Sequence, residues 1–246
     1  MEIYPGSPEI PFITTAQMIE VDRAMMADYQ IGLIHMMENA GRNLAHLARL
    51  RFLEKNPIRK RVTILAGPGG NGGGAMVCAR RLHNWGASVQ VFTTRADQEF
   101  KSIPAHQLKI LHRMNLSIKP AHEINQTHKP DHIIDGVIGY SLSGNPRGTA
   151  AQLIEWANTH NAPILALDVP SGIDTTTGQV FQPAILATAT MTLALPKAGF
   201  LLPKAKNQIG ELYLADISIP PQLYSKLSLE LKVGNIFAEN EIIRLW

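Results

Sequence analysis

Near the start of the chain, apolar residues recur at the three- and four-residue spacing of helices. The segment Thr14-Thr15-Ala16-Gln17 has the spacing of a capping box, and it precedes Met18, Val21 and Met25, which share one helical face. A second set has the same spacing over several turns: Leu33, Met36, Met37, Ala40, Leu44 and Leu47. These patterns predict two helices, and the apolar stripe of the second is broad enough to pack against a sheet.

From residue 62 onward, short apolar and β-branched runs alternate with helical stretches. The predicted strands are 62–66, 88–92, 132–134, 163–167, 191–195 and 211–215, and helices are predicted near 74–85, 105–114 and 149–160. Strands that are apolar throughout are buried on both faces, and helical crossovers join parallel strands. We therefore expect a single domain over residues 1–246, a three-layer α/β/α sandwich around a mostly parallel, Rossmann-like sheet. Residues 221–246 are a docked tail or the start of a linker, and the pattern does not decide between the two.

Composition narrows the class of partner. The 246 residues include 23 Lys and Arg and 20 Asp and Glu, a net charge of +3, and no stretch gathers basic and aromatic residues, so a nucleic-acid partner is not expected. The single cysteine, Cys78, excludes an internal disulfide and fits a reducing compartment, so we expect a cytoplasmic protein. The most apolar stretch, Ile185 to Leu195, is interrupted by threonines and too short to span a bilayer, so membrane association is not expected.

A glycine-rich segment, Gly67 to Gly74, links the first predicted strand of the sheet to a helix. Glycine lets the backbone approach a ligand closely, and a helix N-terminus offers unpaired N–H groups to an anion. A tight turn is the simpler interpretation, but six glycines in eight residues exceed what a turn needs, which favours a phosphate or pyrophosphate site. The segment differs from the usual dinucleotide fingerprint, because no acidic residue follows the second strand to bind a ribose hydroxyl. It also lacks the lysine of a Walker loop.

Three ionisable residues follow predicted strands. Asp135 and Asp168 each stand at the C-terminal end of a strand, where open α/β sheets bind their ligands, and Lys197 follows another strand. Each residue alone is as well explained as a turn, cap or solvated side chain. Strand ends that converge on the glycine segment bring the two carboxylates close to a bound nucleotide, which favours a functional role.

Together these segments resemble the YjeF N-terminal domain family, the NAD(P)H-hydrate epimerases. The resemblance covers roughly residues 12 to 220. It depends on ordered motifs: Met37-Glu-Asn-Ala-Gly41, the glycine segment, Asp135 with Gly139 to Gly148, Asp168-Val-Pro-Ser-Gly172 and Pro196-Lys197. This order of motifs is far more specific than a glycine-rich loop alone.

The resemblance implies an isomerase of metabolite repair, a homodimer that interconverts the R and S forms of NADHX and NADPHX and acts together with an NAD(P)H-hydrate dehydratase. It implies one potassium ion per subunit, held by Asn71, Asp135 and Ser171, whose oxygen atoms suit a hard cation. The implied substrate-binding residues are Gly70, Asn71, Gly72, Gly73, Gly74, Gly139, Tyr140, Ser141, Leu142, Ser143, Gly144, Asn145 and Asp168. This chain has glycine at 70 and 74, where the family typically has asparagine and aspartate.

For catalysis we expect Asp168 to be the general acid/base and Lys197 to tune or neutralise it. The alternative is a non-catalytic, dimerising module on the same fold that binds nucleotide or RNA, which the altered glycine segment favours and the joint presence of Asn71, Asp135, Asp168, Ser171 and Lys197 disfavours. An ordinary NAD-dependent oxidoreductase is a weaker interpretation, because the ribose-binding acid after the second strand is absent.

Overall fold

One eight-stranded sheet organises the chain, in the order β3-β2-β1-β4-β5-β6-β7-β8. A computed structural model describes residues 10–127, 129–226 and 228–246; residues 1–9, which the expected domain includes, lie outside the described part. The strands are β1 Arg61–Ala66, β2 Ser88–Thr93, β3 Ser117–Pro120, β4 His132–Gly136, β5 Ile164–Leu167, β6 Ala189–Leu193, β7 Glu211–Ala215 and β8 Ile242–Arg244. All neighbours are parallel except β7 and β8. The expectation of a mostly parallel sheet is confirmed.

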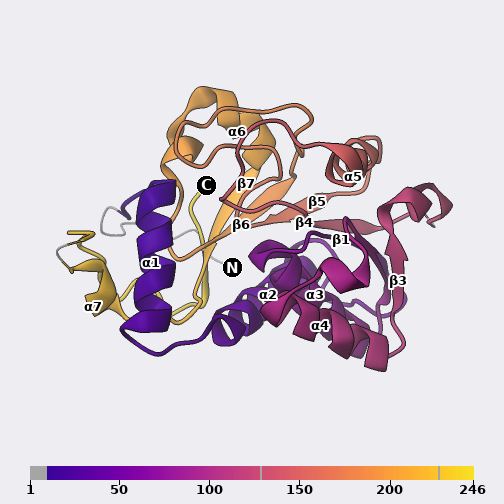
Figure 1. The fold of residues 1–246 in the computed structure, drawn as a ribbon, viewed down its shortest axis with the longest axis horizontal. Helices are drawn as coiled ribbons and strands as arrows, with labels where there is room; N and C mark the ends of the chain where they lie inside the picture. Colours follow the sequence, from indigo (N-terminus) through magenta and orange to yellow (C-terminus); the bar gives the residue numbers. More distant parts are fainter. Residues whose placement is uncertain (1–9, 128, 227) are drawn as a thin grey trace.

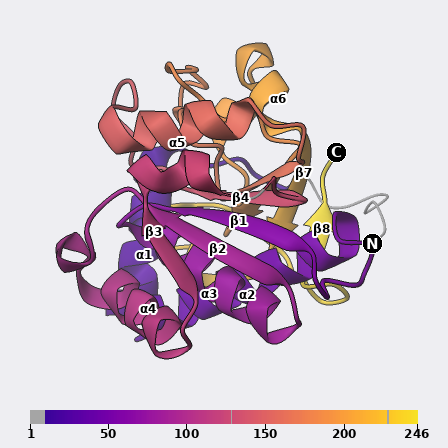
Figure 2. The ribbon, with the colours of Figure 1, turned by 90° about the vertical axis from the view of Figure 1, so that its right-hand side faces the viewer.

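Helices cover both faces of the sheet and complete the expected three layers (Figures 1 and 2). They are α1 Thr15–Ala27, α2 Leu33–Arg51, α3 Gly70–Asn84, α4 Ser102–Arg113, α5 Gly148–Asn158, α6 Pro203–Ile209 and α7 Pro221–Tyr224, with 3-10 turns at Asp97–Glu99, Ala121–Gln126 and Ala198–Leu201. Figure 2 shows α2, α3 and α4 on one face and α5 and α6 on the other. In the described part of the chain, no helix has the length and apolar content needed to cross a bilayer.

The first helix begins as its sequence predicts. Thr14 caps α1: its hydroxyl accepts a bond from the backbone N–H of Gln17 at 3.3 Å, and the Gln17 amide oxygen accepts one from the Thr14 N–H at 2.9 Å. Met18, Val21 and Met25 are buried in the core that α1 shares with α2, α3 and α4. Four orphan N–H groups open every helix, so this reciprocal cap stabilises the start of α1.

The third helix starts earlier than its sequence suggests. We expected a helix from residue 74, whereas α3 begins at Gly70 and includes most of the glycine segment. Glycine is a weak helix former, but tertiary packing requires it here. A Cβ on Gly41 of α2 would lie 2.5 Å from the carbonyl oxygen of Gly74, and a Cβ on Gly73 would lie 2.6 Å from the sulfur of Met37. The glycines therefore let α2 and α3 pack backbone to backbone.

The C-terminal segment, which the sequence left open as a tail or a linker, contributes the last strand of the sheet. β8 pairs antiparallel with β7, with Leu214 opposite Ile243. Beyond it, the Trp246 indole stacks on Phe12 at a centroid distance of 6.5 Å and donates to the carbonyl of Gly210 at 3.1 Å. These contacts cover the edge of β7, which removes an unpaired strand edge from the surface.

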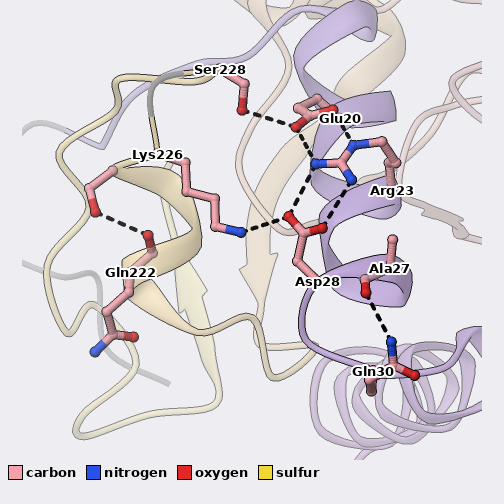
Figure 3. Close-up of polar contacts among 9 residues, drawn as sticks. Glu20, Arg23, Ala27, Asp28, Gln30, Gln222, Lys226 and Ser228 are labelled. Carbon is pink, nitrogen blue, oxygen red and sulfur yellow. Dashed lines mark hydrogen bonds and ion pairs between the residues drawn. The ribbon is translucent and has the colours of Figure 1, made fainter.

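A network of charged side chains fastens the segment after α7 to α1 (Figure 3). The guanidinium of Arg23 lies 2.7 Å from Glu20 and 3.1 Å from Asp28, and the ammonium of Lys226 lies 2.6 Å from the same Asp28. Ser228 donates to Glu20 at 3.0 Å. The hydrogen bond from Arg23 lowers the pKa of both Glu20 and Asp28 to about 2. The network orients α1, which also forms one wall of the candidate site.

A buried histidine makes the stability of the fold dependent on pH. His132 opens β4 with its ring stacked on Phe52 at 4.7 Å, and burial lowers the pKa of the imidazole from 6.5 to about 3. The folded state holds the neutral ring, whereas the unfolded chain takes up a proton below pH 6.5, so this contribution is complete above pH 6.5 and is lost as the pH falls toward 3. Between about pH 7 and 5.5 we expect the free energy of unfolding to drop by about 1 kcal/mol through this residue.

Urea unfolding of the wild type and of His132→Phe at both pH values measures this effect. The phenylalanine ring keeps the stacking surface and cannot be protonated, so the variant should lose less stability than the wild type on acidification. Equal losses in the two proteins would contradict the assignment.

Candidate active site

Two adjoining cavities open where the C-terminal strand ends face α1. An outer groove of about 520 Å³ runs between α1, the first turn of α3 and the loop that follows β4. An inner pocket of about 80 Å³ leads from it toward the ends of β5 and β6. Both are lined by Asp22, Leu33, Gly70, Asn71 and Tyr140, so the groove and the pocket form one continuous site. Such a site at the carboxyl edge of a parallel sheet is where open α/β folds bind ligands.

Asp168 lies in the inner pocket with a strained backbone. It follows β5 at a φ of 65°, in the left-handed region that non-glycine residues rarely adopt, although aspartate and asparagine do so more readily than others. Its side chain is 4% exposed. The Oδ1 atom accepts bonds from the Leu193 N–H at 3.1 Å and from the Lys197 ammonium at 2.7 Å. The carboxylate is thereby held in one orientation by the neighbouring strand.

Lys197 is fully buried beneath this carboxylate. Besides Asp168, its ammonium donates to the Thr192 hydroxyl at 3.1 Å and to the carbonyls of Leu193 and Leu195 at 2.9 and 3.0 Å. A buried ammonium needs both a counter-charge and acceptors for its protons, and it has both here. The structure thus brings together the two residues that the sequence predicted to be catalytic.

A second buried carboxylate, Asp135 at the end of β4, lies beside the glycine segment. Its Oδ2 accepts the Ser171 N–H at 2.8 Å, and its Oδ1 accepts the Ser171 hydroxyl at 2.7 Å and the Val137 N–H at 3.1 Å. Burial raises the pKa of this carboxyl to about 6, against the opposing effect of these bonds. Among the described residues, no Lys, Arg or His forms an ion pair with Asp135.

Asn71 joins the two carboxylate regions. Its amide donates to the carbonyl of Leu167 at 2.7 Å, directly before Asp168, and its Oδ1 would lie 2.8 Å from a Cβ at Gly139. The loop after β4 therefore passes over Asn71 only because residue 139 is glycine. Asn71, Asp135 and Ser171 lie in one neighbourhood rich in oxygen atoms. The described residues contain no cluster of three His, Cys, Asp or Glu that could hold a metal, so a cation here would need amide, hydroxyl and carbonyl ligands as well.

The predicted substrate-binding residues fall into three groups. Those that line the cavities are Gly70, Asn71, Gly72, Gly139, Tyr140, Ser141 and Asp168. Leu142, Ser143, Gly144 and Asn145 continue the loop beyond the groove wall. Gly73 and Gly74 are buried within α3, where a Cβ on Gly74 would lie 2.8 Å from the Cδ2 of Leu167. An aspartate at position 74 would thus require Leu167, a residue of the pocket wall, to move.

Sequence reasoning missed Asp22. This residue of α1 lines both cavities and accepts a hydrogen bond from the hydroxyl of Tyr140. It directly follows Val21 on the buried face of the predicted helix, and a polar residue beside an apolar stripe was the available signal. Nothing in the local pattern distinguishes it from an ordinary polar edge, because the groove forms only when α1 packs against the sheet.

Comparison with known proteins shows the family to which this chain belongs. The family model described as YjeF-related protein N-terminus matches residues 33–199, which include the glycine segment, both buried aspartates and Lys197. The chain belongs to the YjeF-related N-terminal family. Within this family it is 40% identical over 222 residues to an NAD(P)H-hydrate epimerase of Dehalogenimonas lykanthroporepellens, with 89% of this chain and 86% of the relative covered.

Other members extend the comparison. An NAD(P)H-hydrate epimerase of Rhodopirellula baltica is 32% identical, with 90% of each chain covered. A bifunctional NAD(P)H-hydrate repair enzyme of Moorella thermoacetica is 33% identical over 86% of this chain, and this chain spans 41% of its length. The crystal structure of the yeast protein ynu0 has a TM-score of 0.80 at 25% identity, covering 96% of this chain and all of the yeast one. The Rossmann-like architecture is thus that of the family.

Proposed function

We propose that this protein is an NAD(P)H-hydrate epimerase that interconverts the R and S forms of NADHX and NADPHX at C6 of the hydrated nicotinamide ring. The observation that carries the proposal is the Asp168–Lys197 pair, held at 2.7 Å at the end of an apolar pocket that opens into a glycine-lined groove. Relatives named as epimerases that align along most of this chain support the same activity.

The chemistry requires proton transfer at the C6 oxygen. Either the hydroxyl leaves and returns on the other face of the ring, or the ring opens and recloses. Asp168 is suited to give and take that proton because its carboxylate borders the pocket. Lys197 balances its charge and fixes its orientation. The apolar lining, which includes Met18, Met36 and Leu193, keeps bulk water from competing for the reacting centre.

The outer groove is suited to the nucleotide half of the substrate. Gly69, Gly70 and Gly72 line it at the start of α3, a helix of 15 residues whose first N–H groups face an approaching anion. Their lack of side chains leaves room for phosphate oxygens to approach the backbone. The groove continues past Tyr140 and Ser141. A bound dinucleotide would thus direct its pyrophosphate to α3 and its ring to Asp168.

We extend the proposal to one potassium ion per subunit, held by Asn71, Asp135 and Ser171. The donor set fits, because Asp135 is a buried carboxylate without an ion-pair partner among the described residues, the Ser171 hydroxyl contacts it at 2.7 Å, and the Asn71 amide oxygen lies beside Gly139 in the loop that follows β4. Such oxygens suit a hard monovalent cation. When bound, the ion would offset the buried negative charge and stiffen the loops that border the groove.

Potassium should stabilise the protein and support its turnover. At a concentration about 100 times its Kd, the ion adds about 2.7 kcal/mol to the free energy of unfolding, and Tm should rise by several degrees. Thermal melts in potassium and in tetramethylammonium salts of equal ionic strength measure this effect. Asp135→Asn should abolish the difference between the two salts, and a wild type that melts at the same temperature in both would contradict the site.

The activity is tested by incubating the purified R form of NADHX with the protein and following the appearance of the S form by chromatography. Rapid approach to the equilibrium mixture, above the spontaneous rate, supports an epimerase. A rate that equals the spontaneous one, with dinucleotide binding intact, would instead support a binding module. Parallel assays with NADPHX determine the preferred substrate.

Three further expectations belong to the same proposal. The protein acts as a homodimer in the cytoplasm, and an NAD(P)H-hydrate dehydratase consumes the epimer that it produces. The bifunctional relatives support the link to hydrate repair. Sedimentation equilibrium tests the oligomeric state directly.

A further inference from the structure

The inner pocket contains a second carboxyl group besides that of Asp168. Asp22 reaches the pocket from α1, whereas Asp168 reaches it from the end of β5, so the two acids border one small cavity from different walls. The remaining lining is mostly apolar, with Met18, Met36 and Leu167 among its residues. Two carboxyl groups in such a cavity interact, and the charge of Asp168 acts on Asp22.

The two carboxyl groups have opposite environments. Asp168 is paired with the buried ammonium of Lys197 at 2.7 Å. Asp22 has no ion-pair partner among the described residues and instead accepts a hydrogen bond from the Tyr140 hydroxyl. Burial is the largest influence on Asp22 and raises its pKa, with the charge of Asp168 acting in the same direction. Paired titratable groups in opposite environments are the usual arrangement of an acid and a base.

We propose that Asp22 is a second catalytic acid/base, which serves one face of the hydrated nicotinamide ring while Asp168 serves the other. This inference rests on the proposed epimerase function. When the hydroxyl leaves one face of C6 and water returns on the other, proton transfer is needed on both faces, and the two carboxyl groups that line the pocket supply it.

The step balances without any redox change. Protonated Asp22 gives its proton to the C6 hydroxyl, the C6–O bond breaks with its electron pair leaving on water, and the ring nitrogen lone pair forms a C=N bond to C6. Water then adds to the other face of C6, the C=N pair returns to nitrogen, and the Asp168 carboxylate takes the released proton. The reverse reaction returns the proton from Asp168 to Asp22.

Tyr140 is the positioning residue in this scheme. Its hydroxyl donates to Oδ2 of Asp22, which leaves Oδ1 to meet the substrate hydroxyl. That bond stabilises the carboxylate form, so it opposes the effect of burial on the pKa of Asp22. The other titratable groups that face Asp22 are Asp168 directly after β5, Lys197 from the segment after β6 and Tyr224 from α7.

The test uses the pH dependence of kcat and kcat/KM for pure R-form NADHX, corrected for spontaneous epimerisation. We expect Asp22→Asn to lower kcat by about 100-fold or more and to remove the alkaline decline of the wild-type profile, because an amide cannot be the acid. The Kd of NADPH should change by less than about threefold. Glu155→Gln, which makes the same carboxyl-to-amide change at an exposed residue of α5 outside both cavities, is the matched control and should retain wild-type kcat.

Tyr140→Phe separates a positioning role from a structural one. Loss of the phenol removes a bond that favours the Asp22 carboxylate, so the acid form should persist to higher pH and the alkaline decline should move upward. The proposal is overturned if the Asp22→Asn variant keeps wild-type kcat, so that any loss of kcat/KM comes from a raised KM alone.

If Asp22→Asn does not fold, the Tyr140→Phe profile decides, and an unmoved alkaline decline overturns the proposal. A wild type without any epimerase activity would instead overturn the proposed function itself, so the two failures are distinguishable.

Discussion

Asp168→Asn is expected to lower the epimerisation rate by about 100- to 10,000-fold, the range that general acid–base catalysis contributes. The amide has nearly the same shape as the carboxylate but cannot take up or release a proton at the C6 oxygen. Its oxygen can still accept the bonds that Leu193 and Lys197 donate to Oδ1. Chromatographic assay of both epimers with wild type and variant measures the effect.

Measurements of folding and of ligand binding serve as controls for this variant. Asparagine tolerates the left-handed backbone at residue 168, so the far-UV spectrum and the Kd of NADPH should stay close to those of the wild type. Equal epimerisation rates in the two proteins would exclude Asp168 as the acid/base and leave its charge with a structural role only.

Lys197→Met should have the largest effect on stability. The ammonium is fully buried, and its removal leaves the Asp168 carboxylate buried without its counter-charge. Breaking a buried ion pair by removing one partner costs about 3–5 kcal/mol in the free energy of unfolding. Methionine retains most of the chain length, so the loss reports charge more than packing. Urea unfolding measures it, and turnover should fall as the orientation of Asp168 is lost.

The double variant Asp168→Asn with Lys197→Met provides the decisive comparison. With both charges removed, no uncompensated charge remains, so the double variant should be more stable than Lys197→Met alone by about 1–3 kcal/mol. If the two effects on stability simply add, the carboxylate and the ammonium are not energetically coupled, and the buried pair does not explain the conformation of the pocket.

The elements that sequence predicts best are those buried on both faces. The predicted runs at β1, β4 and β5 match strands whose residues are nearly all buried. A short, uninterrupted apolar run is typical of a strand that is covered on both faces of a parallel sheet. β3 and β8 were missed for opposite reasons. Ser117–Pro120 is partly exposed at the sheet edge and lacks an apolar run, and Ile242–Arg244 is a strand only because β7 offers it an edge.

The site residues at strand ends were easier to predict than the one on a helix. Asp168 and Lys197 were predicted from their positions after strands together with the resemblance to the family, and the structure places the two side chains 2.7 Å apart. Asp22 was not predicted because it belongs to a helix whose position beside the strand ends depends on tertiary packing, including the contact with α7 and the charged network with the segment after it. The hydrophobic pattern of a single helix does not report contacts between segments that are far apart in the sequence.

The left-handed backbone at Asp168 also limits how this site can change over evolutionary time. A φ of 65° is tolerated by aspartate, asparagine and glycine, so a longer acid such as glutamate would pay a conformational penalty as well as overfill an 80 Å³ pocket. Asparagine is the replacement for Asp168 that this backbone conformation allows, and it keeps the fold and its ligand contacts while removing the titratable proton. A lineage that takes this step leaves the buried Lys197 ammonium without its counter-charge, so a change from turnover to pure ligand recognition also requires a change at residue 197 to restore the folding free energy.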